Sequence, residues 1–125
     1  MQRMTRLLRA NAFEGSYYDL TVNPQDEGVG EVTVFWDRGE VQRVTATSNL
    51  IIGFQNPVAG RRLVLAIVQD AAGGRRVLLW PGYVRWSGGT EPTLSTAPKS
   101  VDLIEFLCMG VETVYGRLWG RWPVP

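Results

Sequence analysis

The chain has 125 residues, of which 45% are hydrophobic and 20% are charged, and its formal net charge is +1. These values fit one globular domain, and the balanced charge argues against a dedicated nucleic-acid groove. No stretch approaches the ~20 apolar residues of a membrane-spanning helix, so neither nucleic acid nor membrane is expected as a partner.

The chemistry available to the side chains is limited. The sequence has no histidine and one cysteine, Cys108, so it lacks the commonest general base and cannot form an internal disulfide or an ordinary structural zinc site. Asp102 and Glu105 fall on opposite faces of a strand and do not make the carboxylate pair of a glycosidase. We therefore expect no enzyme activity, no metal and no cofactor. Glu105 lies in an apolar strand, which calls for an arginine partner or leaves a carboxyl with a raised pKa.

The first element in chain order is a basic N-terminal arm, residues 1–15. It carries arginines on one side and apolar residues roughly opposite, and it is too short to form a stable helix alone. We expect these side chains to form a docking arm that contacts a neighbouring subunit, a solvated tail being the alternative. The contact residues would be Arg3, Met4, Arg6, Leu7, Leu8 and Arg9.

Strand patterns begin after the arm. Residues 17–22 form a first candidate strand, ended by Asn23-Pro24. Residues 31–36 alternate, with Val32, Val34 and Trp36 on one face, and residues 40–47 return with Val44 and Ala46 inward. The two segments predict a β-hairpin. Residues 50–54 predict a further short strand.

The second half of the chain contains strands that are apolar on both faces. Residues 63–68 and 103–108 have this character, which requires either two layers or a partner subunit over the outer face. Residues 75–80 are the expected hairpin mate of 63–68, and 111–119 form a last strand. Many short strands without a helical period predict an all-β domain over residues 16–125. The expected architecture is an antiparallel β-sandwich or barrel of the jelly-roll or tulip-like kind, with an extended N-terminal arm.

Aromatic residues are the other candidate contact groups. Aromatic side chains bury large areas and are enriched in cores and at subunit interfaces, and they also form platforms for sugars. A core or interface role is the favoured interpretation, and carbohydrate contact is the alternative. The residues proposed for a subunit interface or an exposed surface are Trp80, Tyr83, Trp86, Trp119 and Trp122.

Residues 30–116 resemble a β-domain found in phage tail fibres, head fibres and related virion surface proteins. The order and spacing of simple turns and strands carry this resemblance. The motifs are Asn56-Pro57, Gly60, Gln69-Asp70-Ala71, Gly73-Gly74-Arg75, Trp80-Pro81, Val84, Trp86, Gly88-Gly89, Pro92-Thr93-Leu94, Val101-Asp102-Leu103 and Phe106. The chain departs from the pattern in a longer segment at 75–80 and in Cys108-Met109-Gly110, where the family often has a Tyr-Asp-Gly turn.

The resemblance implies a non-enzymatic virion protein that is usually trimeric. A short arm on an isolated domain is similar to a small capsid decoration, or cementing, protein of a bacteriophage head. Its partners would then be its own copies and the major capsid protein, and it would lie on the capsid exterior after synthesis in the host cytoplasm. The alternative is a tail-fibre or tail-tip module that binds host surface glycans.

Overall fold

The computed structural model describes residues 17–110 and 112–123. The expected arm contacts at Arg3, Met4, Arg6, Leu7, Leu8 and Arg9 therefore lie outside the described residues. Within the described ranges the regular elements are ten strands and one 3-10 turn, η1 (Ser87–Gly89). The prediction of an all-β fold is confirmed for this part of the chain.

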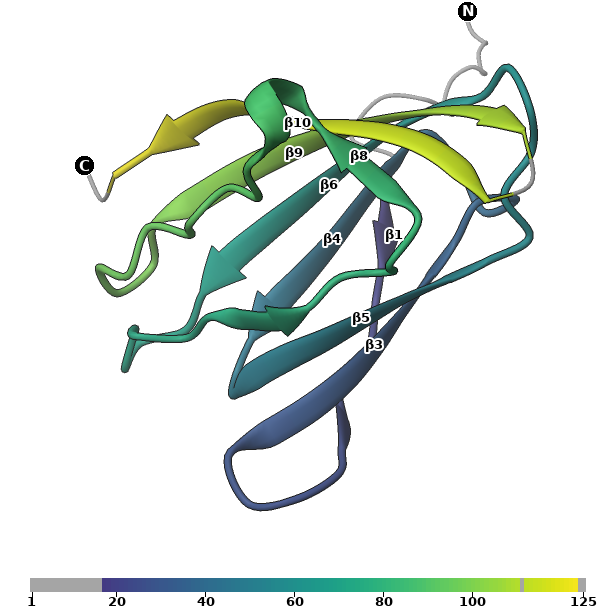
Figure 1. Ribbon diagram of the computed structural model, residues 1–125. Coiled ribbons are helices and arrows are strands. Elements are labelled where there is room, and N and C mark those ends of the chain that lie inside the picture. The colour runs from purple at the N-terminus through teal and green to yellow at the C-terminus, as the bar shows by residue number, and fades with distance from the viewer. Residues whose placement is uncertain (1–16, 111, 124–125) are drawn as a thin grey trace, which may run out of the picture.

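The strands form two sheets that face each other across one hydrophobic core (Figure 1). The six-stranded sheet has, in spatial order, β1 (Tyr18–Asp19), β4 (Val41–Ala46), β6 (Arg62–Gln69), β9 (Val101–Gly110), β10 (Thr113–Trp122) and β8 (Val84–Trp86). The four-stranded sheet has β2 (Asn23–Pro24), β3 (Val29–Phe35), β5 (Asn49–Gln55) and β7 (Val77–Leu79).

Both sheets are mixed, so the expectation of an antiparallel fold is wrong. From β3 to β8 the chain passes alternately from one sheet to the other. Consecutive strands in this part of the chain therefore lie in opposite layers. The strands that become neighbours within one sheet are every second strand, and these run in the same direction. Among the described residues five strand pairings are parallel and three are antiparallel.

The predicted hairpin over residues 31–47 is also wrong, because β3 and β4 lie in different sheets. The inward side chains were identified correctly: those of β3 and β4 are buried, but they meet across the core instead of side by side. The buried side chain of Gln42 holds the corner between the two strands. Its Nε2 donates to the Phe35 carbonyl at 2.5 Å and to the Gly39 carbonyl at 3.2 Å, and its Oε1 accepts from the Phe35 N–H at 3.3 Å. These bonds satisfy backbone groups that a hairpin ladder would have paired.

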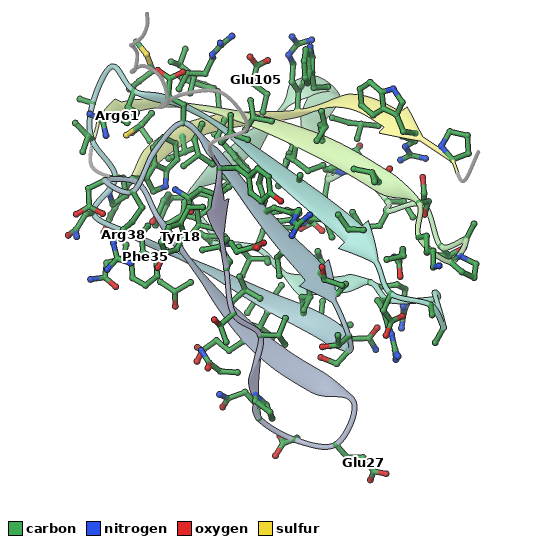
Figure 2. The ribbon with its side chains drawn as sticks, turned by 180° about the vertical axis from the view of Figure 1, so that it is seen from behind. Tyr18, Glu27, Phe35, Arg38, Arg61 and Glu105 are labelled. Atoms are coloured by element: carbon green, nitrogen blue, oxygen red, sulfur yellow. The ribbon has the colours of Figure 1, made fainter. Side chains whose placement is uncertain are left out.

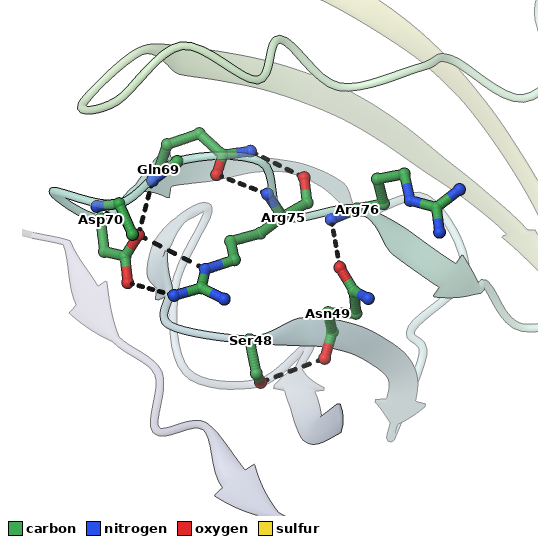
Figure 3. A network of polar contacts seen from close by, with 8 residues as sticks. Ser48, Asn49, Gln69, Asp70, Arg75 and Arg76 are labelled. Atoms are coloured by element: carbon green, nitrogen blue, oxygen red, sulfur yellow. Dashed lines mark hydrogen bonds and ion pairs between the residues drawn. The ribbon is translucent and has the colours of Figure 1, made fainter. Parts of the chain in front are cut away.

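The expected pairing of residues 75–80 with 63–68 is wrong for a similar reason. β7 pairs with β5 in the four-stranded sheet, and both edges of β6 are occupied by β4 and β9. Figure 3 shows how side chains fix the β6–β7 connection. Gln69 exchanges two hydrogen bonds with the backbone of Arg75, at 2.8 and 3.0 Å, and also donates to the Ser95 carbonyl. Asp70 accepts from the Arg75 guanidinium at 3.0 Å and from the Gly73 N–H at 3.0 Å.

The core lies between the sheets and is rich in aromatic residues. Trp36 and Phe106 are fully buried, and Phe54 contacts both rings edge-on at centroid distances of 5.5 and 5.1 Å. Cys108 is buried among these side chains, as its apolar surroundings predicted. Because the inward residues of both sheets share this core, the opposite side chains of the six-stranded sheet are left on its outer face.

Candidate functional site

The outer face of the six-stranded sheet, meaning the side chains that point away from the core, carries many apolar residues. On the central strands β6 and β9 the outward side chains are apolar except for Arg62 and Glu105, and most are half-buried against their neighbours. Near the end of β9 and the start of β10 the exposure rises, reaching 57% for Met109 and 48% for Tyr115. The apolar residues of this face on the two central strands are Val64, Ala66, Val68, Val101, Leu103, Leu107 and Met109. Such a patch on one face indicates an interaction surface more than a fully solvated one.

A charged row crosses this apolar face. Glu105, whose side chain is 16% exposed, accepts from Arg62 at 3.1 Å and from Arg117 at 2.8 Å. The three residues come from β6, β9 and β10, which are adjacent strands. The expected arginine partner of Glu105 is confirmed, and two arginines share the role.

The same residues border a groove of about 450 Å³, which we call the arginine groove. Its lining residues are Arg62, Arg85, Trp86, Ser87, Glu105, Leu107, Tyr115, Gly116 and Arg117. Arg85 of β8 pairs with Tyr115 of β10 in the ladder, and its side chain makes no hydrogen bond or ion pair with any residue in the described ranges. Three guanidinium groups therefore face one carboxylate, and the groove is positive with an apolar floor.

One wall of the arginine groove depends on a glycine. Gly116 pairs with Trp86 in the ladder, and a Cβ at Gly116 would lie 2.8 Å from the Trp86 ring and 3.0 Å from the Phe106 ring. The Trp86 ring thus occupies the place of a side chain at position 116. Trp80 supports it from inside, with a centroid distance of 5.0 Å.

The aromatic residues selected from the sequence separate into three environments. Trp80 is a core residue, only 3% exposed, and so does not form an exposed surface on this chain. Tyr83 and Trp86 are half-buried at the rim of the core. Burial and the nearby carboxylate of Glu112 raise the pKa of the Tyr83 hydroxyl.

The remaining two aromatic residues, Trp119 and Trp122, are exposed. They are 54% and 50% exposed and lie 6.3 Å apart between ring centroids near the end of β10. A Cβ at Gly120 would lie 2.6 Å from the Trp122 ring, so this ring lies over the glycine. The pair extends the apolar outer face toward the end of the chain.

No catalytic arrangement is apparent among residues 17–110 and 112–123. Asp102 is 2% exposed and accepts from the Ser95 N–H at 2.6 Å and from its hydroxyl at 2.9 Å, which is a structural role. Within these ranges no group of three histidine, cysteine, aspartate or glutamate side chains is placed to hold a metal ion. The described part of the chain also contains no helix that is long and apolar enough to cross a membrane.

Sequence reasoning missed the arginine groove as a unit. The isolated acid in an apolar strand pointed to an arginine partner for Glu105, but nothing local identified Arg62 or Arg117, which are 43 and 12 residues away in sequence. Comparison with known proteins adds no further candidate: no family model, no curated protein and no solved structure matches the chain.

Proposed function

We propose that the chain is a structural protein of a bacteriophage particle, a capsid decoration protein that forms homotrimers and stabilises the shell. The observation that carries the proposal is the apolar outer face of the six-stranded sheet, with Met109 57% and Trp122 50% exposed. Covering each such half-exposed side chain is worth on the order of 1 kcal/mol, so contact with another subunit would be favourable. The sequence resemblance to virion surface β-domains supports the particle context.

The N-terminal arm has a part in this proposal. Arg3, Met4, Arg6, Leu7, Leu8 and Arg9 would contact a neighbouring subunit or the major capsid protein. An arm added to a docked face raises the overall affinity through effective concentration. Binding to the assembled shell then stabilises that shell by mass action.

The proposal is tested first by the copy number in purified particles, measured by quantitative mass spectrometry against the major shell protein. A copy number comparable to that of the shell protein supports a decoration role. Complete absence from particles contradicts any virion role. Deleting residues 1–12 should weaken attachment to isolated shells while leaving the fold intact, as measured by shell binding and by circular dichroism.

A matched pair of variants tests the outer face directly. Met109→Glu introduces a charge on the outer face, where Met109 is 57% exposed, and should reduce both self-association and shell binding. Leu79→Glu introduces the same charge on β7 of the other sheet, where Leu79 is 59% exposed, and should leave both unchanged. Equal effects of the two changes would contradict the role of the outer face.

The second candidate function is a tail-fibre or tail-tip module that contacts host surface glycans. The exposed pair Trp119 and Trp122 favours it, because adjacent aromatic rings can stack on sugars. A few copies per particle, together with loss of cell adsorption and normal head stability in Trp119→Ala/Trp122→Ala, would support this function over decoration.

A further inference from the structure

The β2–β3 hairpin ends in an exposed acidic tip, which we define as residues 25–28. Asp26 and Glu27 are both exposed, and neither side chain forms an ion pair within the described ranges. The turn is closed by hydrogen bonds between Gln25 and Val29 and between Val29 and Asp26, both 3.0 Å long, and by Gly28 at φ +74°. The tip therefore presents two carboxylates on a fixed backbone.

The acidic tip projects beyond the body of the two sheets, as the loop below β3 in Figure 1 shows. Figure 2 places Glu27 at the end of this loop and Glu105, in the arginine groove, at the opposite end of the molecule. A chain therefore cannot place its own tip in its own groove. Any contact between the two must join different copies.

The charges of the two surfaces are complementary. Residues 17–37 contain five acids and no lysine or arginine, and the tip lies within this segment. The arginine groove presents three guanidinium groups against one carboxylate. Arg85 has no charged partner among the described residues, and Glu105 is already paired with Arg62 and Arg117. Complementary potentials of this kind select partners and orientation.

From these observations we propose that the acidic tip of one copy docks in the arginine groove of the next copy. Asp26 and Glu27 would pair with the groove arginines, while Leu107 and Tyr115 form the apolar floor under the turn. The contact joins two different patches and is heterologous. Heterologous contacts are the kind from which cyclic rings, including trimers, are built. This inference rests on the proposed self-association and names the surfaces that make it.

Two charge-reversal variants test the contact. Asp26→Lys/Glu27→Lys gives a basic tip and leaves the groove intact. Arg62→Glu/Arg85→Glu gives an acidic groove and leaves the tip intact, while Glu105 keeps Arg117 at 2.8 Å. A control, Asp37→Lys/Glu40→Lys, makes the same net charge change as the basic-tip variant, at two exposed acids outside both surfaces. Circular dichroism and thermal unfolding check that each variant is folded.

Sedimentation velocity over a concentration series measures the self-association of each protein. Wild type and the control should associate with the same dissociation constant, and added salt should weaken the association of both. Each reversal variant alone associates at least about tenfold more weakly, because like charges now meet. A 1:1 mixture of the two reversal variants associates more tightly than either variant alone, because basic tips meet acidic grooves and acidic tips meet basic grooves. A ring of three that contains both variants keeps one like-charge contact, so the mixture stays weaker than wild type.

If the mixture of the two folded reversal variants associates no more tightly than each variant alone, or if either variant alone behaves as wild type does, the tip does not occupy the groove. A wild type that stays monomeric at every concentration also overturns the contact. These outcomes leave the decoration role to be judged separately, by the particle copy number and by shell binding of the wild-type chain.

Discussion

Replacing Gly116 by alanine tests the packing that forms the wall of the arginine groove. The new Cβ would lie 2.8 Å from the Trp86 ring and 3.0 Å from the Phe106 ring, closer than side chains normally approach. Overpacking of this kind costs roughly 1–3 kcal/mol. The loss of glycine flexibility in the unfolded chain returns about 0.4–1 kcal/mol. We expect Gly116→Ala to lower the free energy of unfolding by about 1–2 kcal/mol.

The assay is urea unfolding followed by circular dichroism, with thermal unfolding as a second measure. For 125 residues, 1 kcal/mol corresponds to a change in Tm of about 4 °C, so a loss of about 4–8 °C is expected. Gly82→Ala is the matched control, because a Cβ at Gly82 meets nothing within 4 Å and the backbone there is not in the left-handed region. Gly82→Ala should leave stability unchanged or raise it slightly.

A double-mutant cycle identifies the cause of the destabilisation. In the Trp86→Leu background the ring that opposes the new Cβ is absent, and only the Phe106 contact at 3.0 Å remains. Gly116→Ala should therefore cost less in that background, with a coupling energy of at least about 0.5 kcal/mol. If Gly116→Ala is as stable as Gly82→Ala, or if its cost is the same in both backgrounds, the Trp86–Gly116 packing argument fails.

Two further predictions concern the connection between β6 and β7. Gln69→Leu should lower the free energy of unfolding by about 3 kcal/mol, because it removes three hydrogen bonds and leaves partly buried backbone groups without partners. Gln55→Leu, at an exposed strand end, should change this free energy little, and urea unfolding measures both. The Arg75 guanidinium, followed by the Gly73 N–H, lowers the pKa of Asp70 below its ordinary 3.8, so the contribution of Asp70 to stability is present above that value and is lost as the pH falls through the lower pKa of the folded state. Asp70→Asn should therefore lose less stability than wild type when the pH is lowered below about 4, and an identical acid dependence of the two proteins would contradict this assignment.

The strands and their buried faces could be predicted from the sequence because alternation is a local property. Successive side chains of a strand point to opposite faces, so the pattern identified Val32, Val34 and Trp36 as inward wherever the strand was placed. The same reasoning separated Asp102 from Glu105 and indicated an arginine partner for Glu105. It did not separate Trp80, which is in the core, from Trp119 and Trp122, which are exposed, because aromatic residues are common in both environments.

Strand partners and directions were decided by the tertiary structure, because alternation is the same in a hairpin and in a turn that crosses between sheets. Gln42 and Gln69 satisfy backbone groups at two such crossings, and neither bond can be inferred from a local pattern. The arginine groove depends on the same long-range choice, since Arg62 and Arg117 meet at Glu105 only when β6, β9 and β10 are neighbours. The sequence by itself determined which side of an alternating strand faces inward, because alternation is local, and the pairing of distant strands determined which exposed side chains act together.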